Sequence, residues 1–63
     1  MEDIQKLLIE FFVVAEDASR KYSPDGHVSY AYLSGIYRSI IPILLLSDNP
    51  IEALKNEIKY LKN

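Results

Sequence analysis

The chain has 63 residues, no cysteine and a net charge of −2 at pH 7. Disulfide bonds and thiolate metal sites are therefore excluded, and the acidic balance argues against the basic surface on which general nucleic-acid binding depends. Hydrophobic residues make up 49% of the sequence, although a domain this small buries only ~60% of its unfolded surface when it folds alone. We therefore expect a single domain, residues 1–63, that is completed by oligomerisation or by a partner chain.

The first predicted element is a helix from Met1 to Tyr22. Its apolar residues recur at intervals of three and four, which places them on one helical face: Ile4, Leu7, Leu8, Phe11, Val14, Ala15, Ala18 and Tyr22. Ile9 and Val13 are four residues apart on the far side of that helix, so they form a second apolar spot. Scattered apolar residues on a protein surface are common. A chain this small, however, has little of its own surface with which to cover apolar residues, so we favour a partner contact at Ile9 and Val13.

The segment from Ser23 to His27, S-P-D-G-H, predicts a chain reversal. Proline in the second position and glycine in the fourth suit a type I turn. Alternatively, Ser23 caps the next helix with Pro24 in its first position. His27 is the only histidine, and we interpret it as a solvated or capping residue, because no nucleophile or second base accompanies it.

The segment from Val28 to Leu46 is the most apolar part of the chain and is predicted to form the central helix. Its apolar residues cover well over half of the circumference, whereas a surface helix shows a stripe of roughly 100°. The exception is a strip of small residues four apart, Ala31, Gly35 and Ser39, which lets another backbone approach closely. We expect a close contact there, either with the last helix or with another chain.

Pro42 interrupts this central helix, because it lacks a backbone N–H and its ring opposes the carbonyl group of Arg38. The helix therefore either bends or stops near Ile41. We favour a bend, since the apolar pattern continues through Pro42. A strand at residues 28–32, where apolar residues alternate, is the lesser alternative, because no second strand is available to pair with it.

The last predicted helix begins after the sequence S-D-N-P and runs from Pro50 to about Leu61. Asn49 is a good N-cap, Pro50 fits the first helical position, and Glu52 follows three residues after the cap, as in a capping box. The apolar stripe of this helix is narrow and its other side is polar. The sequence thus predicts an all-α fold of three helices: a long helix, a tight turn, a Pro-kinked central helix antiparallel to the first, and a short C-terminal helix.

No constellation in the sequence supplies acid, base and nucleophile together, so we expect no catalytic, cofactor-binding or metal site. The two glycines, Gly26 and Gly35, are isolated and form no phosphate-binding loop. The tyrosines near the middle are interpreted as core or interface residues rather than as a platform for stacking bases: Tyr22, Tyr30, Tyr32 and Tyr37.

We therefore expect a non-enzymatic protein–protein interaction module: a small accessory or stabilising subunit of a larger intracellular complex, as in replication, transcription or viral machinery, or a homodimeric helical bundle. The predicted interface residues are Ile9, Val13, Ala31, Gly35 and Ser39. The alternative is a small dimeric regulator of helix-turn-helix type that binds nucleic acid through Arg20, Lys21 and Arg38.

The expected setting is cytoplasmic, with no membrane partner. The N-terminus is acidic and shows no signal peptide, and no stretch approaches the ~20 apolar residues of a membrane span. The abundance of Ile, Leu, Lys and Glu with little Gln resembles the composition of thermophilic proteins.

Overall fold

The computed structural model describes residues 3–63. It contains three helices, α1 (Ile4–Arg20), α2 (Tyr30–Leu46) and α3 (Pro50–Lys62), and no strand in this range. The predicted all-α, three-helix class is confirmed, and the strand alternative at residues 28–32 is wrong. Met1 and Glu2, which were expected in the first helix, lie outside the described residues.

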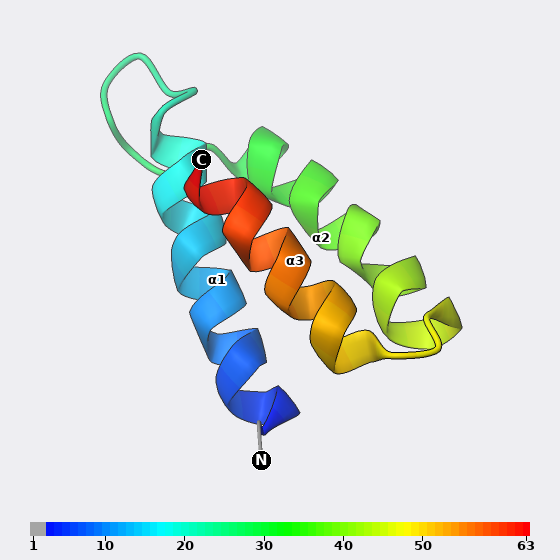
Figure 1. The fold of residues 1–63 in the computed structure, drawn as a ribbon. Helices are drawn as coiled ribbons and strands as arrows, with labels where there is room; N and C mark the ends of the chain where they lie inside the picture. The colour runs from blue at the N-terminus through cyan, green and yellow to red at the C-terminus, as the bar shows by residue number, and fades with distance from the viewer. Residues whose placement is uncertain (1–2) are drawn as a thin grey trace.

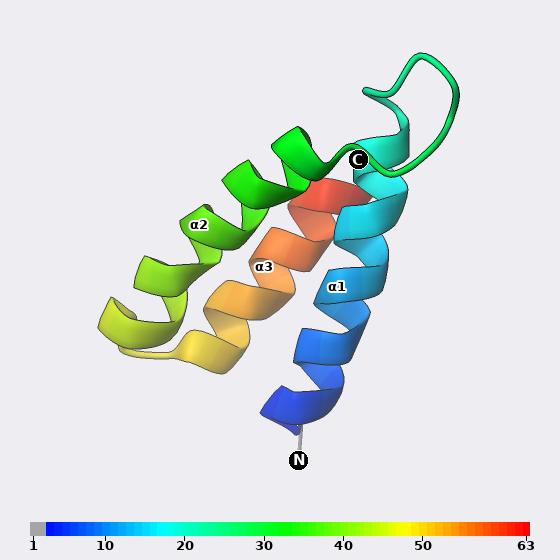
Figure 2. The ribbon, with the colours of Figure 1, turned by 180° about the vertical axis from the view of Figure 1, so that it is seen from behind.

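The three helices lie side by side, with α3 between α1 and α2 in the views of Figures 1 and 2. α1 and α3 run in the same direction and α2 runs against both (Figure 1), so the first two helices are antiparallel, as predicted. The contact between α1 and α3 is the most extensive and that between α1 and α2 the least. α1 and α2 separate towards the end opposite the turn that joins them (Figure 2). α3 therefore joins the other two helices.

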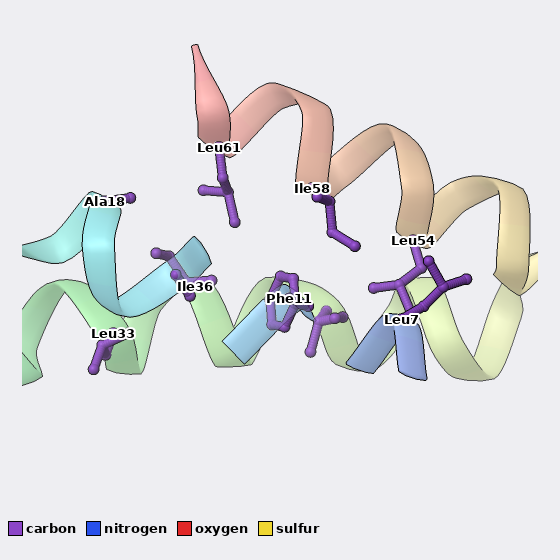
Figure 3. Close-up of a cluster of buried hydrophobic side chains, with 10 residues drawn as sticks. Leu7, Phe11, Ala18, Leu33, Ile36, Leu54, Ile58 and Leu61 are labelled. Atoms are coloured by element: carbon purple, nitrogen blue, oxygen red, sulfur yellow. The ribbon is translucent and has the colours of Figure 1, made fainter. Parts of the chain in front are cut away.

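The hydrophobic core is formed by all three helices, with the ring of Phe11 fully buried. Figure 3 shows side chains from α1, α2 and α3 pointing toward one another in this cluster. The buried hydrophobic residues are Leu7, Phe11, Ala15, Ala18, Leu33, Ile36, Ile40, Leu54, Ile58 and Leu61. α1 buries four residues of its predicted apolar face, but Ile4 and Tyr22 of that face are exposed, and the helix ends at Arg20 rather than at Tyr22. α2 and α3 bury three side chains each.

Each helix begins at a polar N-cap. The Asp3 carboxylate accepts the Gln5 N–H at 3.0 Å, and the Asn49 side-chain oxygen accepts the Glu52 N–H at 3.1 Å, so the predicted cap of α3 is confirmed. The N-cap of α2 is Ser29, whose hydroxyl accepts the Tyr32 N–H. The alternative in which Ser23 caps the central helix is therefore wrong, and that helix begins at Tyr30 rather than at Val28.

Ser19 connects the end of α1 to the start of α2. Its side chain is fully buried; its hydroxyl donates to the Glu16 carbonyl at 2.8 Å and accepts the Ser29 N–H at 3.2 Å. Since Ser29 itself caps α2, two hydroxyl groups in series tie the helices together. This junction fixes the position of α2 along the length of α1, with Ser29 beside Ser19.

The segment between α1 and α2 contains the predicted turn, in which the Gly26 N–H donates to the Ser23 carbonyl at 3.2 Å. Gly26 has a φ of +77°, a conformation that glycine adopts without steric cost. The Ser23 hydroxyl and the His27 backbone N–H both donate to Asp25, and these bonds lower the pKa of the Asp25 carboxyl group. The turn is thus held by its own side chains.

α2 continues through Pro42 to Leu46, so the alternative in which the helix stops near Ile41 is wrong. The bend that proline favours at this point stays a prediction. Pro42 is exposed. Because proline has no backbone N–H, the Arg38 carbonyl group does not receive the hydrogen bond that residue 42 would otherwise donate. The continuous helix carries its apolar residues beyond the proline.

The folded chain is elongated, with principal extents of 38 × 21 × 18 Å. Its radius of gyration is 12.0 Å, whereas a compact domain of this length has about 11 Å. An elongated shape exposes more surface for the same core. Ten large hydrophobic side chains in the described range are consequently exposed.

Candidate protein-binding surfaces

A group of exposed apolar side chains extends over α1 and α2. On each helix its members recur at intervals of three and four, which places them on one side. We call it the α1/α2 face, and it consists of Ile9, Phe12, Val13 and Glu16 from α1 and Tyr30, Ser34, Tyr37, Arg38 and Ile41 from α2. It includes both predicted interface residues of the first helix, Ile9 and Val13.

An aromatic contact joins the two helices at the middle of this face. The rings of Phe12 and Tyr37 meet edge to face at a centroid distance of 5.5 Å, and the buried Phe11 ring lies 6.4 Å from Tyr37. Beside Tyr37 is an open groove of about 600 Å³, lined by α1, α2 and the residue Val28 before α2. Aromatic pairs of this geometry stabilise the contact beyond their buried area, so the centre of the face is preformed.

The aliphatic residues of the α1/α2 face are more than half exposed. The exposed fractions are 59% for Ile9, 56% for Val13 and 54% for Ile41. Leu45, one helical turn beyond Ile41, is 76% exposed. Exposed apolar patches of this kind are common at interaction sites, which makes the α1/α2 face the candidate surface.

The α1/α2 face also carries one acid and one base, Glu16 from α1 and Arg38 from α2, which line the same groove. Both side chains are exposed, and neither makes an ion pair within residues 3–63. Arg20, which lies one helical turn after Glu16, binds Asp17 at 2.8 Å and does not pair with Glu16. Glu16 is thereby left available to a partner.

The small-residue strip, Ala31, Gly35 and Ser39, lies on a different side of α2. It borders an open groove shared with α3, where Glu57, Tyr60 and Leu61 form the other wall. A Cβ atom added at Gly35 meets nothing within 4 Å. The expected close contact between the strip and the last helix is therefore wrong, because α3 packs against the neighbouring side of α2; a contact with another chain stays a prediction.

The three basic residues proposed for nucleic-acid contact do not form a patch. Arg20 is engaged by Asp17 at the end of α1, and Lys21 follows it. Arg38 lies nine residues after Ser29, the residue at which α2 is joined to α1. It is therefore roughly 13 Å along α2 from that end of the bundle. Arg38 also lines the same groove as Glu16, so its surroundings are mixed in charge.

The tyrosines of the central region divide between two places. Tyr30 and Tyr37 belong to the α1/α2 face, whereas Tyr22 and Tyr32 stack on each other at 4.4 Å. Desolvation, together with the neighbouring Tyr22, raises the pKa of Tyr32. This stack joins the segment after α1 to the first turn of α2.

Metal sites and membrane spans have no candidate in the part of the chain that the structure describes. Residues 3–63 contain no group of three His, Asp or Glu side chains placed to hold a metal ion. None of the three helices is long and apolar enough to cross a membrane. His27 lies on the turn with its imidazole Nε2 3.9 Å from the Asp25 carboxylate.

The sequence prediction missed the α2 half of the face. Tyr37 was interpreted only as a core or interface residue, Ile41 only as part of the apolar central helix, and Phe12 was not singled out. The spacing of Ile9, Phe12 and Val13 at positions i, i+3 and i+4 was the available signal on α1. Comparisons of the chain with protein-family models, curated proteins and solved structures found no significant match.

Proposed function

We propose that the protein is a non-enzymatic protein–protein interaction module that binds its partner through the α1/α2 face. The observation that carries the proposal is the continuity of this face: apolar side chains from two helices are joined by the Phe12–Tyr37 contact and remain exposed on either side of it. Binding here would cover Ile9, Val13 and Ile41 together.

The free energy available from such binding is substantial for a chain of this size. Full burial of one aliphatic side chain stabilises by about 1.5–3 kcal/mol relative to full exposure. Each of the three aliphatic residues on the face is already about half buried, so each offers roughly half of that amount to a partner. The net stability of a folded domain is only about 5–15 kcal/mol. Burial of the three side chains would therefore add a large share to the stability of a chain whose described core has ten side chains.

In this proposal the module acts as a small accessory or stabilising subunit of a larger cytoplasmic assembly, or as half of a homodimeric bundle. The module offers a helical surface, and the hydrogen bonds of Ser19 to Glu16 and Ser29 hold its two helices at a fixed level. Rigid, preformed surfaces bind with a smaller loss of conformational entropy than flexible ones.

Site-specific photo-crosslinking in the native cell tests this proposal. A photoreactive amino acid is placed at Val13 or Ile41 on the face and, as the control, at Asn56, an exposed position of α3. We expect protein adducts from positions 13 and 41 and none, or far fewer, from position 56. Equal labelling from all three positions, no adduct from either face position, or adducts that disappear after nuclease treatment would overturn the proposal.

A further inference from the structure

We infer that the occupant of the α1/α2 face is a second copy of this chain; the inference rests on the proposed function and names the partner. In a two-fold dimer the same patch faces itself, so every charge in it must find an opposite charge within the same patch. The α1/α2 face meets that condition, because it contains one acid, Glu16, and one base, Arg38, among apolar residues.

The placement of these two charges suits a two-fold axis that runs parallel to the helices. Such an axis lays α1 of one protomer over α2 of its partner, so each Glu16 faces the helix that carries the partner copy's Arg38. Two symmetric pairs then form. Within residues 3–63 neither side chain has an ion-pair partner to give up.

The contacts within the protomer fix how far apart the charges lie along the helices. Ser19 is level with Ser29, and the Phe12 ring meets Tyr37. Glu16 lies four residues to one side of Phe12, and Arg38 lies one residue to the other side of Tyr37. Glu16 and Arg38 are therefore offset by about 8 Å along the axis. This offset does not exceed the Debye length at physiological salt, ~8 Å, so salt does not fully screen the attraction between the two charges.

The same axis makes every neighbouring pair of helices antiparallel. α1 and α2 are antiparallel within the protomer (Figure 2), and α1 of one copy is antiparallel to α2 of the other. The interface is therefore a four-helix arrangement with alternating directions, the common up-and-down pattern of helical bundles. α3 of each copy lies outside these four helices and keeps its polar side in solvent.

The size of the face also matches what a stable dimer needs. Each of the two helices has 17 residues, hence a length of about 25 Å, and a pair of packed helices is roughly 20 Å wide. Such a rectangle has a flat area of ~500 Å², and the relief of its side chains raises the accessible area towards the ~800 Å² per partner of a standard interface. That area is about a sixth of the protomer surface of 4669 Å².

Charge reversal with mixing tests the pairing. Glu16→Arg makes both charges of the face positive, and Arg38→Glu makes both negative. We expect each variant alone to dimerise at least 10-fold more weakly than the wild type in sedimentation equilibrium. We expect an equimolar mixture to regain dimers with a dissociation constant within about 3-fold of the wild-type value, because each variant then supplies what the other lacks.

Matched controls separate this effect from net charge and from folding. Asp48→Arg and Lys59→Glu make the same charge changes at exposed positions outside the face, and we expect both to dimerise like the wild type. Helicity by circular dichroism is expected to be unchanged in all four variants at concentrations where each is examined. Retained dimers in both face variants, or failure of the mixture to recover, would overturn the inference.

The wild-type mass distinguishes this inference from the proposed function. A wild-type protein that stays monomeric at several hundred micromolar overturns the self-association inference. If the same protein still forms adducts with a different protein from positions 13 and 41, the proposed function stands. If it forms no adducts there, the proposed function fails too.

Discussion

α2 and α3 each place three side chains in the core, yet they differ in what they leave outside. α3 buries Leu54, Ile58 and Leu61, and its outer side is mostly polar. α2 buries Leu33, Ile36 and Ile40 but also exposes large apolar residues, from Tyr30 to Leu46. α3 therefore carries about as many apolar side chains as the single chain buries. α2 carries more apolar side chains than the single chain buries. Because the two helices contribute equally to the core, this apolar surplus is the reason that we propose a second contact for α2.

The largest expected effect contrasts a core residue of α3 with an outer residue of α2. Leu54 is fully buried and Leu45 is 76% exposed. Leu54→Ala is expected to destabilise the protomer by about 2–5 kcal/mol, because it leaves a cavity in the core. Leu45→Ala is expected to change stability by less than ~0.5 kcal/mol, since it alters a surface position. Urea unfolding followed by circular dichroism measures both.

Ile58→Val serves as the milder core control, because it removes a single methylene group from the same buried cluster. Its expected cost is roughly 0.5–1.5 kcal/mol. The contrast between α2 and α3 is contradicted if Leu45→Ala lowers the free energy of unfolding as much as Leu54→Ala does. That result would mean that the outer side of α2 is already covered in the folded form that is being unfolded.

The second prediction addresses the α1 half of the α1/α2 face. Changing Ile9 and Val13 together to Glu places two charges where apolar contact is expected. Each side chain is about half exposed, so each offers ~1 kcal/mol to a partner, and we expect association to weaken at least ~30-fold. Helicity is expected to be retained, because these positions lie outside the core. Sedimentation equilibrium and circular dichroism measure the two quantities on the same sample.

Its control is the double change of Asn56 and Lys59 to Glu on the outer side of α3, which is expected to leave association unchanged. If the Ile9 and Val13 double variant is unfolded at every concentration, folding depends on association. Dilution of the wild type checks this, since only an obligate oligomer loses helicity on dilution. Unchanged association in the double variant would contradict the assignment of this face.

The fold was predictable where the signals are local. Asn49, Pro50 and Glu52 mark the start of α3 through contacts within four residues, and the structure confirms that start. The start of α2 was misplaced, because Val28 continues the apolar pattern although it is not helical; it packs against the core from the segment before the helix. A side chain can be apolar for packing without belonging to the helix that follows.

The candidate site was predictable only in part, because it is built from two helices. Ile9 and Val13 were found from the periodicity of one helix, which places them opposite its core side. Which residues of α2 would join them depends on the rotation of α2 against α1, and no local pattern encodes that angle. The same reason explains Gly35: its spacing from Ala31 is helical, but the direction from which α3 approaches is a tertiary property.

The third prediction tests the junction that holds the two helices of the face at a common level. Ser19→Ala removes the acceptor of the Ser29 N–H and leaves that group without its partner in a part-buried position. The expected cost is about 1–2 kcal/mol, or a fall in melting temperature of roughly 4–16 °C for a domain of this size. Ser39→Ala is the control, since the Ser39 hydroxyl bonds only within its own helix, to the Ile36 carbonyl. Equal losses in the two variants would contradict a special role for Ser19.

The smallest expected effect separates the two surfaces of α2. Gly35 lies inside the helix at an exposed position, and an added Cβ meets nothing within 4 Å. Gly35→Ala is therefore expected to stabilise the protomer by about 0.5–1 kcal/mol, because alanine loses less backbone entropy in a helix. Thermal unfolding at two protein concentrations, roughly 20-fold apart, measures the change. A gain that is equal at both concentrations means that no second chain packs on the small-residue strip, and it leaves the α1/α2 face as the candidate interface. A loss that grows with concentration would instead mean that a second chain packs closely on Gly35, as the sequence spacing suggested, and would move the interface to the groove between α2 and α3.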